Sequence, residues 1–140
     1  MKLCAFCAIA AGASEGHLVH DGTEVIAFLD RAPLVKGHVL IAPRAHIETL
    51  DDLPPDLIGP LFAVVQRVSR ALQRSLGADG SLTMANTRIS QSVPHVHVHV
   101  VPRHQDDGLF RAGMVWIRKR YQNEEAAQLA ARLREAIAAS

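Results

Sequence analysis

The chain is 140 residues long, which is the size of one ordinary domain with its own hydrophobic core. An apolar fraction of 49% and a charged fraction of 21% exclude a disordered chain, and no apolar run is long enough for a membrane span. A net charge of +1 excludes a strongly basic nucleic-acid binder, and the basic run 118–120 is expected to be a solvated face. With two cysteines and no signal-peptide pattern, we expect a cytoplasmic protein that partners neither membrane nor nucleic acid.

Turn-forming residues and apolar periodicity divide the chain into eight predicted elements. Alternating apolar residues favour strands, and apolar residues spaced three or four apart favour helices. In chain order we expect a helix over 4–11, strands over 18–21, 24–30 and 37–42, a long helix between Pro55 and Gly77, strands over 81–87 and 94–101, and a last helix capped by Asn123. This order predicts an α+β domain in which an antiparallel sheet of about five strands is covered by helices.

The clearest predicted strand carries a histidine at every second position. Residues 95–101 are His-Val-His-Val-His-Val-Val. Because strand side chains alternate between faces, His95, His97 and His99 share one face and the valines share the other. Since valine suits burial under a helix, we expect the three imidazoles to line up on a solvent-facing side of the sheet.

Three interpretations of this histidine row are open on residue pattern alone. The row is a solvated polar face, a metal site, or a centre for nucleophilic catalysis at phosphorus. A metal site would need further acidic or histidine ligands, whereas Val100, Val101 and Pro102 follow the row. Nucleophilic catalysis needs no metal at the reacting centre, because one imidazole attacks while its neighbours hold phosphate oxygens and protonate the leaving group.

Several segments resemble the histidine-triad (HIT) family. Residues 91–103 are similar to its signature, His-φ-His-φ-His-φ-φ with φ apolar, together with the Gln-Ser-Val before it and the Pro-Arg after it. Two further stretches resemble other family blocks: 27–30 with 36–46, and the Cys-x-Phe-Cys-x-Ile start of many bacterial members at 4–9.

The resemblance implies one HIT-like domain over 1–140, with the motifs in about 4–104 and a C-terminal extension over about 105–140. Family members bind a purine nucleotide conjugate and split the bond between its α-phosphate and a leaving group. The conjugate is a dinucleoside polyphosphate, a phosphoramidate or an acyl-adenylate. We therefore expect a homodimeric nucleotide hydrolase or nucleotidyl transferase that uses no organic cofactor.

The resemblance also implies a role for each histidine. His97 would be the nucleophile and would form a covalent nucleotidyl-histidine. His99 would hydrogen-bond the phosphate and help the leaving group to depart. The backbone carbonyl of His95 would fix the tautomer of His97, and His38 corresponds to a fourth histidine behind the triad.

The implied nucleotide-binding residues are Phe28, Asp30, Asn86, Gln91 and Ser92. Asp30 would accept hydrogen bonds from the ribose hydroxyls. Ser92 and backbone N–H groups near Gln91 would hold the α-phosphate oxygens, and Asn86 matches a phosphate-side asparagine.

The turn after Asn86 departs from the family pattern, because it is shorter than usual and ends in Ser90 where the family usually has glycine. This departure supports the main alternative, which is a nucleotide-binding module with weak or no catalysis. A second alternative is a metal-dependent hydrolase that uses the three triad histidines as ligands.

The pair Cys4-x-x-Cys7 alone is compatible with a redox pair, half of a zinc site or two buried small residues. The resemblance implies a structural zinc ion bound by Cys4, Cys7, His46 and His95. Such an ion would tie the N-terminal segment to the histidine strand and leave His97 free.

Overall fold

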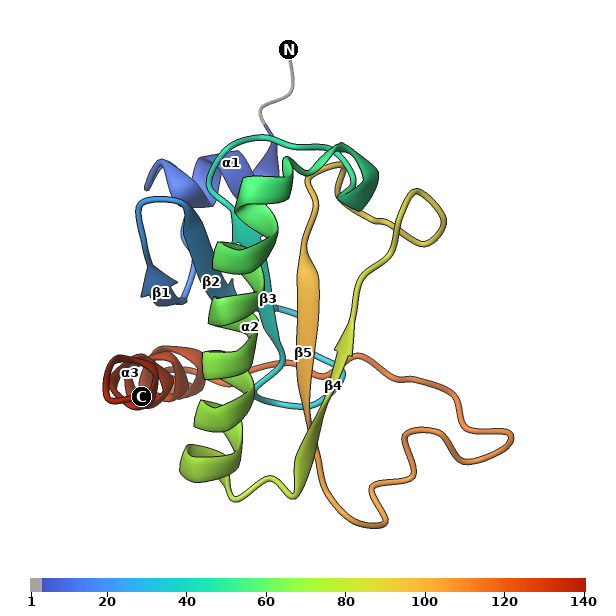
Figure 1. The fold of residues 1–140 in the computed structure, drawn as a ribbon. Coiled ribbons are helices and arrows are strands. Elements are labelled where there is room, and N and C mark those ends of the chain that lie inside the picture. The colour runs from blue at the N-terminus through green and yellow to red at the C-terminus, as the bar shows by residue number, and fades with distance from the viewer. Residues whose placement is uncertain (1–3) are drawn as a thin grey trace.

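The computed structural model describes residues 4–140 as an antiparallel sheet with helices on both faces (Figure 1). In chain order its elements are α1 (Ala5–Ala10), β1 (Leu18–Asp21), β2 (Val25–Leu29), β3 (Val39–Pro43), the 3₁₀ helix η1 (Leu50–Asp52), α2 (Pro55–Leu76), β4 (Gly80–Met84), β5 (Val98–Arg103) and α3 (Glu125–Ala138). The five strands lie in the order β1-β2-β3-β5-β4, and each neighbouring pair is antiparallel. The predicted α+β class, the five-stranded sheet and the C-terminal helix are therefore confirmed.

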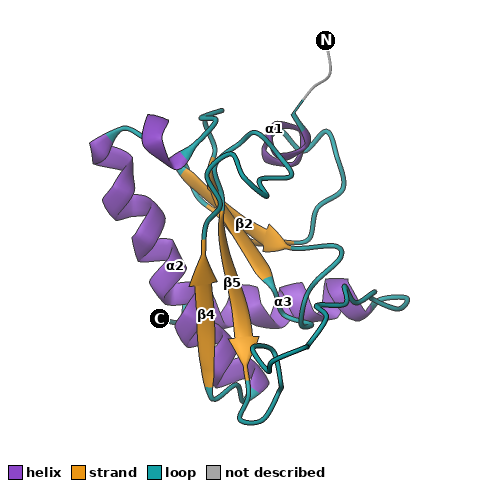
Figure 2. Cartoon of the chain, turned by 90° about the vertical axis from the view of Figure 1, so that its right-hand side faces the viewer, coloured by secondary structure: helices purple, strands orange, loops and turns teal. Residues whose placement is uncertain are grey.

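The larger core lies between one face of the sheet and the helices α2 and α3 (Figure 2). Val96, Val98 and Val100 all belong to this core, which confirms that the valines of the histidine strand share a buried face. α2 is amphipathic and ends at Gly77, whose φ of 64° is the left-handed conformation that a helix C-cap favours. Among residues 4–140, none of the helices has the length and apolar character to cross a membrane.

The opposite face of the sheet is covered as well. The prediction that the three imidazoles face solvent is therefore wrong. His95, His97 and His99 are only 0%, 5% and 7% exposed. The helix α1 folds back onto this face, where Phe6 packs edge-on against Phe28 and joins a second, smaller core. The face was predicted to be wet because alternation along one strand shows which residues share a face, but not what lies over that face.

Two predicted strand boundaries are also wrong. β5 begins at Val98 rather than at residue 94, because the N–H of Val96 donates to the carbonyl of Ile47 in the loop after β3 (2.7 Å) instead of joining a strand ladder. β4 ends at Met84 rather than at residue 87, because the chain turns into the loop that leads to the histidine segment.

Asn123 does not cap the last helix as predicted. α3 starts at Glu125, and no side-chain cap hydrogen bond is formed at its N-terminus by Glu124. The carboxylate of Glu125 instead accepts a hydrogen bond from the backbone N–H of Gln122 (3.0 Å), which satisfies a donor just before the helix.

Candidate active site

A pocket of about 690 Å³ opens on the α1 side of the sheet. Its walls include Phe28 of β2, the following Asp30, Ser92 from the loop before β5, and the rings of His97 and His99. The structure therefore brings together, in one cavity, two triad histidines and three of the predicted nucleotide-binding residues. A cavity of this size is typical of small-molecule sites.

The other two predicted nucleotide-binding side chains, Asn86 and Gln91, are not part of this wall. Asn86 Nδ2 donates to the carbonyl of Ser90 (3.1 Å), and Gln91 Nε2 donates to the carbonyl of Glu48 (2.7 Å). Gln91 Oε1 also accepts from the backbone N–H of Arg88 (2.8 Å). The two amide side chains therefore fix the loop that carries Ser92 without lining the pocket themselves.

Backbone conformation explains how this loop manages without the usual glycine. Ser90 has a φ of 62° and Arg88 a φ of 68°, both in the left-handed region that glycine occupies most easily. A side chain in this region costs roughly 1–2 kcal/mol per residue. The loop therefore keeps a glycine-like turn at a cost in stability.

The ring of His97 has one nitrogen committed and one free. Its Nδ1 lies 2.7 Å from the backbone carbonyl of His95, so Nδ1 carries the proton and donates it to that oxygen. Nε2 consequently keeps its lone pair, on a ring that lines the pocket. Burial lowers the pKa of His97 below its usual value, which keeps the ring neutral and nucleophilic.

A relay of hydrogen bonds gives His99 the opposite tautomer. The backbone N–H of Leu34 donates to His38 Nδ1 (3.1 Å), so the proton of His38 is on Nε2 and is donated to His99 Nδ1 (2.9 Å). The proton of His99 is therefore on Nε2. Burial lowers the pKa of both His38 and His99 to about 4, although the nearby carboxylate of Asp30 acts in the other direction.

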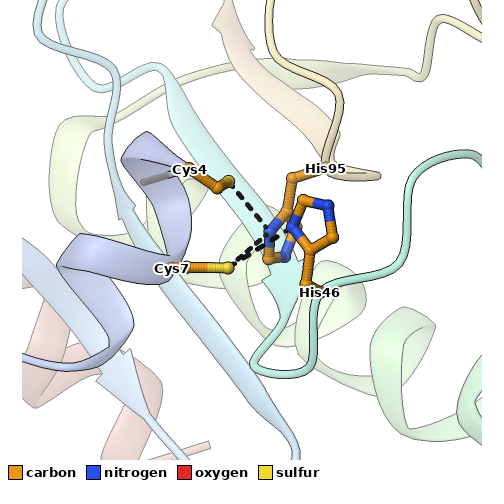
Figure 3. Close-up of side chains that lie close together, drawn as sticks. All are labelled: Cys4, Cys7, His46 and His95. Atoms are coloured by element: carbon orange, nitrogen blue, oxygen red, sulfur yellow. Dashed lines mark hydrogen bonds between the residues drawn. The ribbon is translucent and has the colours of Figure 1, made fainter. Parts of the chain in front are cut away.

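Four side chains converge where α1 meets the histidine segment (Figure 3). Cys4 Sγ and Cys7 Sγ lie 3.4 Å and 3.6 Å from His95 Nδ1, and Cys7 Sγ lies 3.4 Å from His46 Nδ1. His95 Nε2 donates to the carbonyl of Pro43 (2.8 Å), so Nδ1 faces the sulfurs with its lone pair. Tetrahedral zinc bonds of about 2.3 Å to sulfur and about 2.0–2.1 Å to nitrogen would place these atoms roughly 3.5 Å apart. The residues therefore fit a zinc ion.

The three triad rings do not form a metal site among themselves. Within residues 4–140, the side-chain clusters that could hold an ion are Cys4, Cys7, His46 and His95, and Asp30, His38 and His99. Neither cluster contains His97, and the first separates His95 from the rest of the triad. This arrangement argues against a metal-dependent hydrolase built on the three histidines.

The pocket wall also contains residues that the sequence analysis did not assign to it, and one of them contacts the predicted site residue Asp30. Arg118, expected on a solvated face, lines the pocket, and its Nη1 donates to Asp30 Oδ2 (3.1 Å) and to the carbonyl of Ala32 (2.8 Å). No local pattern marks this arginine, because the partner is 88 residues away in the chain.

The fold and the pocket define a histidine-triad protein, and comparison with known proteins shows the same class. The family model described as the HIT domain matches residues 11–106, so the chain belongs to the HIT family. An uncharacterized HIT-like protein of Saccharolobus solfataricus is 37% identical over 107 residues, which cover 75% of this chain and 77% of the relative.

Solved and named relatives add detail. The crystal structure of a zinc-bound histidine-triad family protein from Mycobacterium smegmatis has a TM-score of 0.84 and 33% identity, covering 97% of this chain and 94% of that one. An adenylylsulfatase of Arabidopsis thaliana is 30% identical over 90% of this chain and 65% of its own length. An asymmetrical bis(5'-nucleosyl)-tetraphosphatase of Schizosaccharomyces pombe is 35% identical over 58% of this chain and 46% of its own length.

Replacing Ser90 with glycine should stabilise the protein, because glycine adopts a φ of 62° without a steric cost. We expect Ser90→Gly to raise the free energy of unfolding by up to about 1 kcal/mol, measured by urea titration. Thr87→Gly is the matched control in the same loop, since Thr87 is not in the left-handed region and glycine there should only add unfolded-state entropy. Equal destabilisation by both changes would contradict the interpretation.

Proposed function

We propose that this HIT protein is a nucleotide hydrolase or nucleotidyl transferase that cleaves the α-phosphate bond of a nucleoside monophosphate conjugate through His97. One observation carries the proposal: two neighbouring pocket histidines have hydrogen-bond partners that assign them opposite tautomers. His97 is held with a free Nε2 lone pair, and His99 is held with a proton on Nε2. The first ring is set to attack and the second to donate.

The proposed reaction has two displacements at phosphorus. His97 Nε2 forms a bond to the α-phosphorus, and the bond from phosphorus to the leaving group breaks. As it departs, the leaving group accepts a hydrogen bond from the Nε2–H of His99 and takes its proton from water, so His99 stays a neutral imidazole. Water or another acceptor then attacks the nucleotidyl-histidine and releases the nucleotide. Two easier steps replace one difficult step.

The rest of the pocket is assigned to holding the nucleotide. The Ser92 hydroxyl and the N–H groups of its loop are proposed to bind α-phosphate oxygens, with Asn86 and Gln91 supporting that loop. Asp30 is proposed to accept from the ribose hydroxyls, and Phe28 to contact the apolar part of the nucleotide.

Relatives named as an adenylylsulfatase and as a bis(5'-nucleosyl)-tetraphosphatase support a nucleotide hydrolase in general terms. The leaving group, whether a second nucleotide, an amine or an acyl group, stays open in the proposal. We keep as predictions that the protein is a homodimer, that residues 1–140 form a single domain, and that the protein is cytoplasmic.

Removing the nucleophile should abolish turnover. We expect His97→Ala to lower kcat on a dinucleoside polyphosphate or adenosine phosphoramidate by on the order of a thousandfold or more. Intact-mass spectrometry of the quenched parent reaction should also show a nucleotidyl adduct that the variant lacks. His104→Ala, which removes an exposed histidine outside the pocket, should retain activity.

A second variant, His97→Asn, keeps a polar side chain at this position. If His97→Ala fails to fold, the loss of turnover can be measured with His97→Asn instead. Turnover at parental rates in either folded His97 variant would contradict the mechanism. Nucleotide binding by the parent without any turnover would favour the binding module, which the short turn ending in Ser90 supports.

The pH dependence should report the lowered pKa of His97. The attacking ring must be neutral, and burial moves its pKa below the ordinary value of 6.5. As the pH falls, kcat/KM should therefore hold its value past pH 6.5 and decline only at lower pH. Initial rates from about pH 4.5 to about pH 8 measure this limb. An acid limb centred at or above pH 6.5 would contradict the assignment.

We propose that Cys4, Cys7, His46 and His95 bind a structural zinc ion, which when bound would cross-link α1 to the histidine segment. The zinc-bound relative from Mycobacterium smegmatis supports this proposal. Protein purified with zinc should contain about one ion per chain by elemental mass spectrometry, and the Cys4→Ser, Cys7→Ser variant should contain almost none. His104→Ala should keep the metal, since that histidine lies outside the cluster. Equal zinc in the double variant and the parent would remove the proposal.

A further inference from the structure

The segment between β5 and α3 returns to the pocket side of the sheet, where backbone and side-chain contacts fix its position. It leaves β5 in orange in Figure 1 and passes behind the sheet to reach α3. The backbone N–H of Lys119 donates to the carbonyl of Pro33 (2.7 Å), and the hydroxyl of Tyr121 accepts from the N–H of Gly37 (2.9 Å). Arg118 therefore extends from an anchored stretch of chain.

Arg118 reaches the carboxylate that is proposed to bind ribose. Its Nη1 lies 3.1 Å from Asp30 Oδ2 and 2.8 Å from the carbonyl of Ala32. The other oxygen, Asp30 Oδ1, accepts from the backbone N–H of Ala32 (2.9 Å). Both carboxylate oxygens thus have one fixed donor, and the orientation of the Asp30 side chain is determined from two sides.

The remaining acceptor capacity of Asp30 matches a vicinal diol. Each carboxylate oxygen can accept two hydrogen bonds, and each of the two has one donor from the protein. One lone pair per oxygen is left, for two adjacent hydroxyls. Arg118 and Asp30 both line the pocket, so these lone pairs lie beside the space that the nucleotide would fill.

We propose that Arg118 is a positioning residue that makes the pocket selective for ribonucleotides over 2′-deoxynucleotides. It does so by holding the Asp30 carboxylate in the orientation that accepts both ribose hydroxyls. This inference rests on the proposed nucleotide function and names the sugar that the same site selects. A carboxylate that is already oriented loses less entropy on binding, and so each hydroxyl contributes more to affinity.

The geometry also indicates that Arg118 acts in recognition more than in folding. Its side chain is 51% exposed, whereas that of Asp30 is 14% exposed. An ion pair with one partner in water contributes little to the free energy of unfolding. Loss of Arg118 should therefore change sugar selectivity while leaving the melting temperature nearly unchanged.

Isothermal titration calorimetry with adenosine monophosphate and its 2′-deoxy analogue tests the proposal on the full chain. The parent should bind the ribonucleotide about tenfold more tightly, as expected for one hydrogen bond to a charged group. In Arg118→Ala the ratio of the two affinities should fall to about twofold or less, mainly through weaker ribonucleotide binding. Arg118→Lys should restore part of the ratio, because lysine donates to one acceptor without the planar guanidinium geometry.

Arg120→Ala is the matched control, since it removes an exposed arginine of the same segment that does not line the pocket. It should keep the parental ratio. An unchanged ratio of ribonucleotide to deoxyribonucleotide affinity in Arg118→Ala would overturn the role of Arg118 and leave the proposed function intact. Tighter ribonucleotide binding by this variant would also overturn that role, because it would mean that the arginine competes with ribose. A parent that binds neither nucleotide would overturn both proposals together.

Discussion

The active-site arrangement depends on the need of buried imidazoles for hydrogen-bond partners. A polar ring removed from water is costly unless its nitrogens are paired, and within residues 4–140 no buried side-chain nitrogen or oxygen lacks a partner. Each of the three triad histidines meets this need by committing at least one ring nitrogen to the surrounding protein. His97 and His95 use backbone carbonyls, and His99 uses His38. The nitrogen that remains then determines what each ring can do.

His95 connects two parts of the molecule through three different atoms. Its Nδ1 faces the two cysteines, its Nε2 donates to the carbonyl of Pro43 at the end of β3, and its own carbonyl accepts from His97 Nδ1. Because α1 supplies one cysteine and the residue before α1 the other, the N-terminal segment is tied to the nucleophile through one residue. The helix that carries Cys7 also carries Phe6, whose ring packs edge-on against His97 with centroids 4.9 Å apart. The same short element therefore covers the site and contributes to the cysteine–histidine cluster.

Local patterns along the chain predicted much of the fold and only part of the site. The alternation of residues 95–101 correctly placed the valines in the core, and the helical spacing before Gly77 correctly predicted α2. The covering of the histidine face by α1 could not be read from either pattern, because it depends on contacts between segments about ninety residues apart. Arg118 was missed for the same reason. Asn86 and Gln91 were assigned to the pocket by resemblance, whereas loop geometry turns their amides toward the backbone.

The central claim is that the protein holds His97 and His99 in opposite tautomers, and nitrogen-15 NMR of the imidazole rings tests it most directly. Long-range proton–nitrogen correlation at neutral pH identifies which ring nitrogen carries the proton. The account predicts a proton on Nδ1 of His97 and on Nε2 of His99, with His38 protonated on Nε2. A His97 ring with its proton on Nε2, or with protons on both nitrogens, would contradict the account because no lone pair would face the pocket.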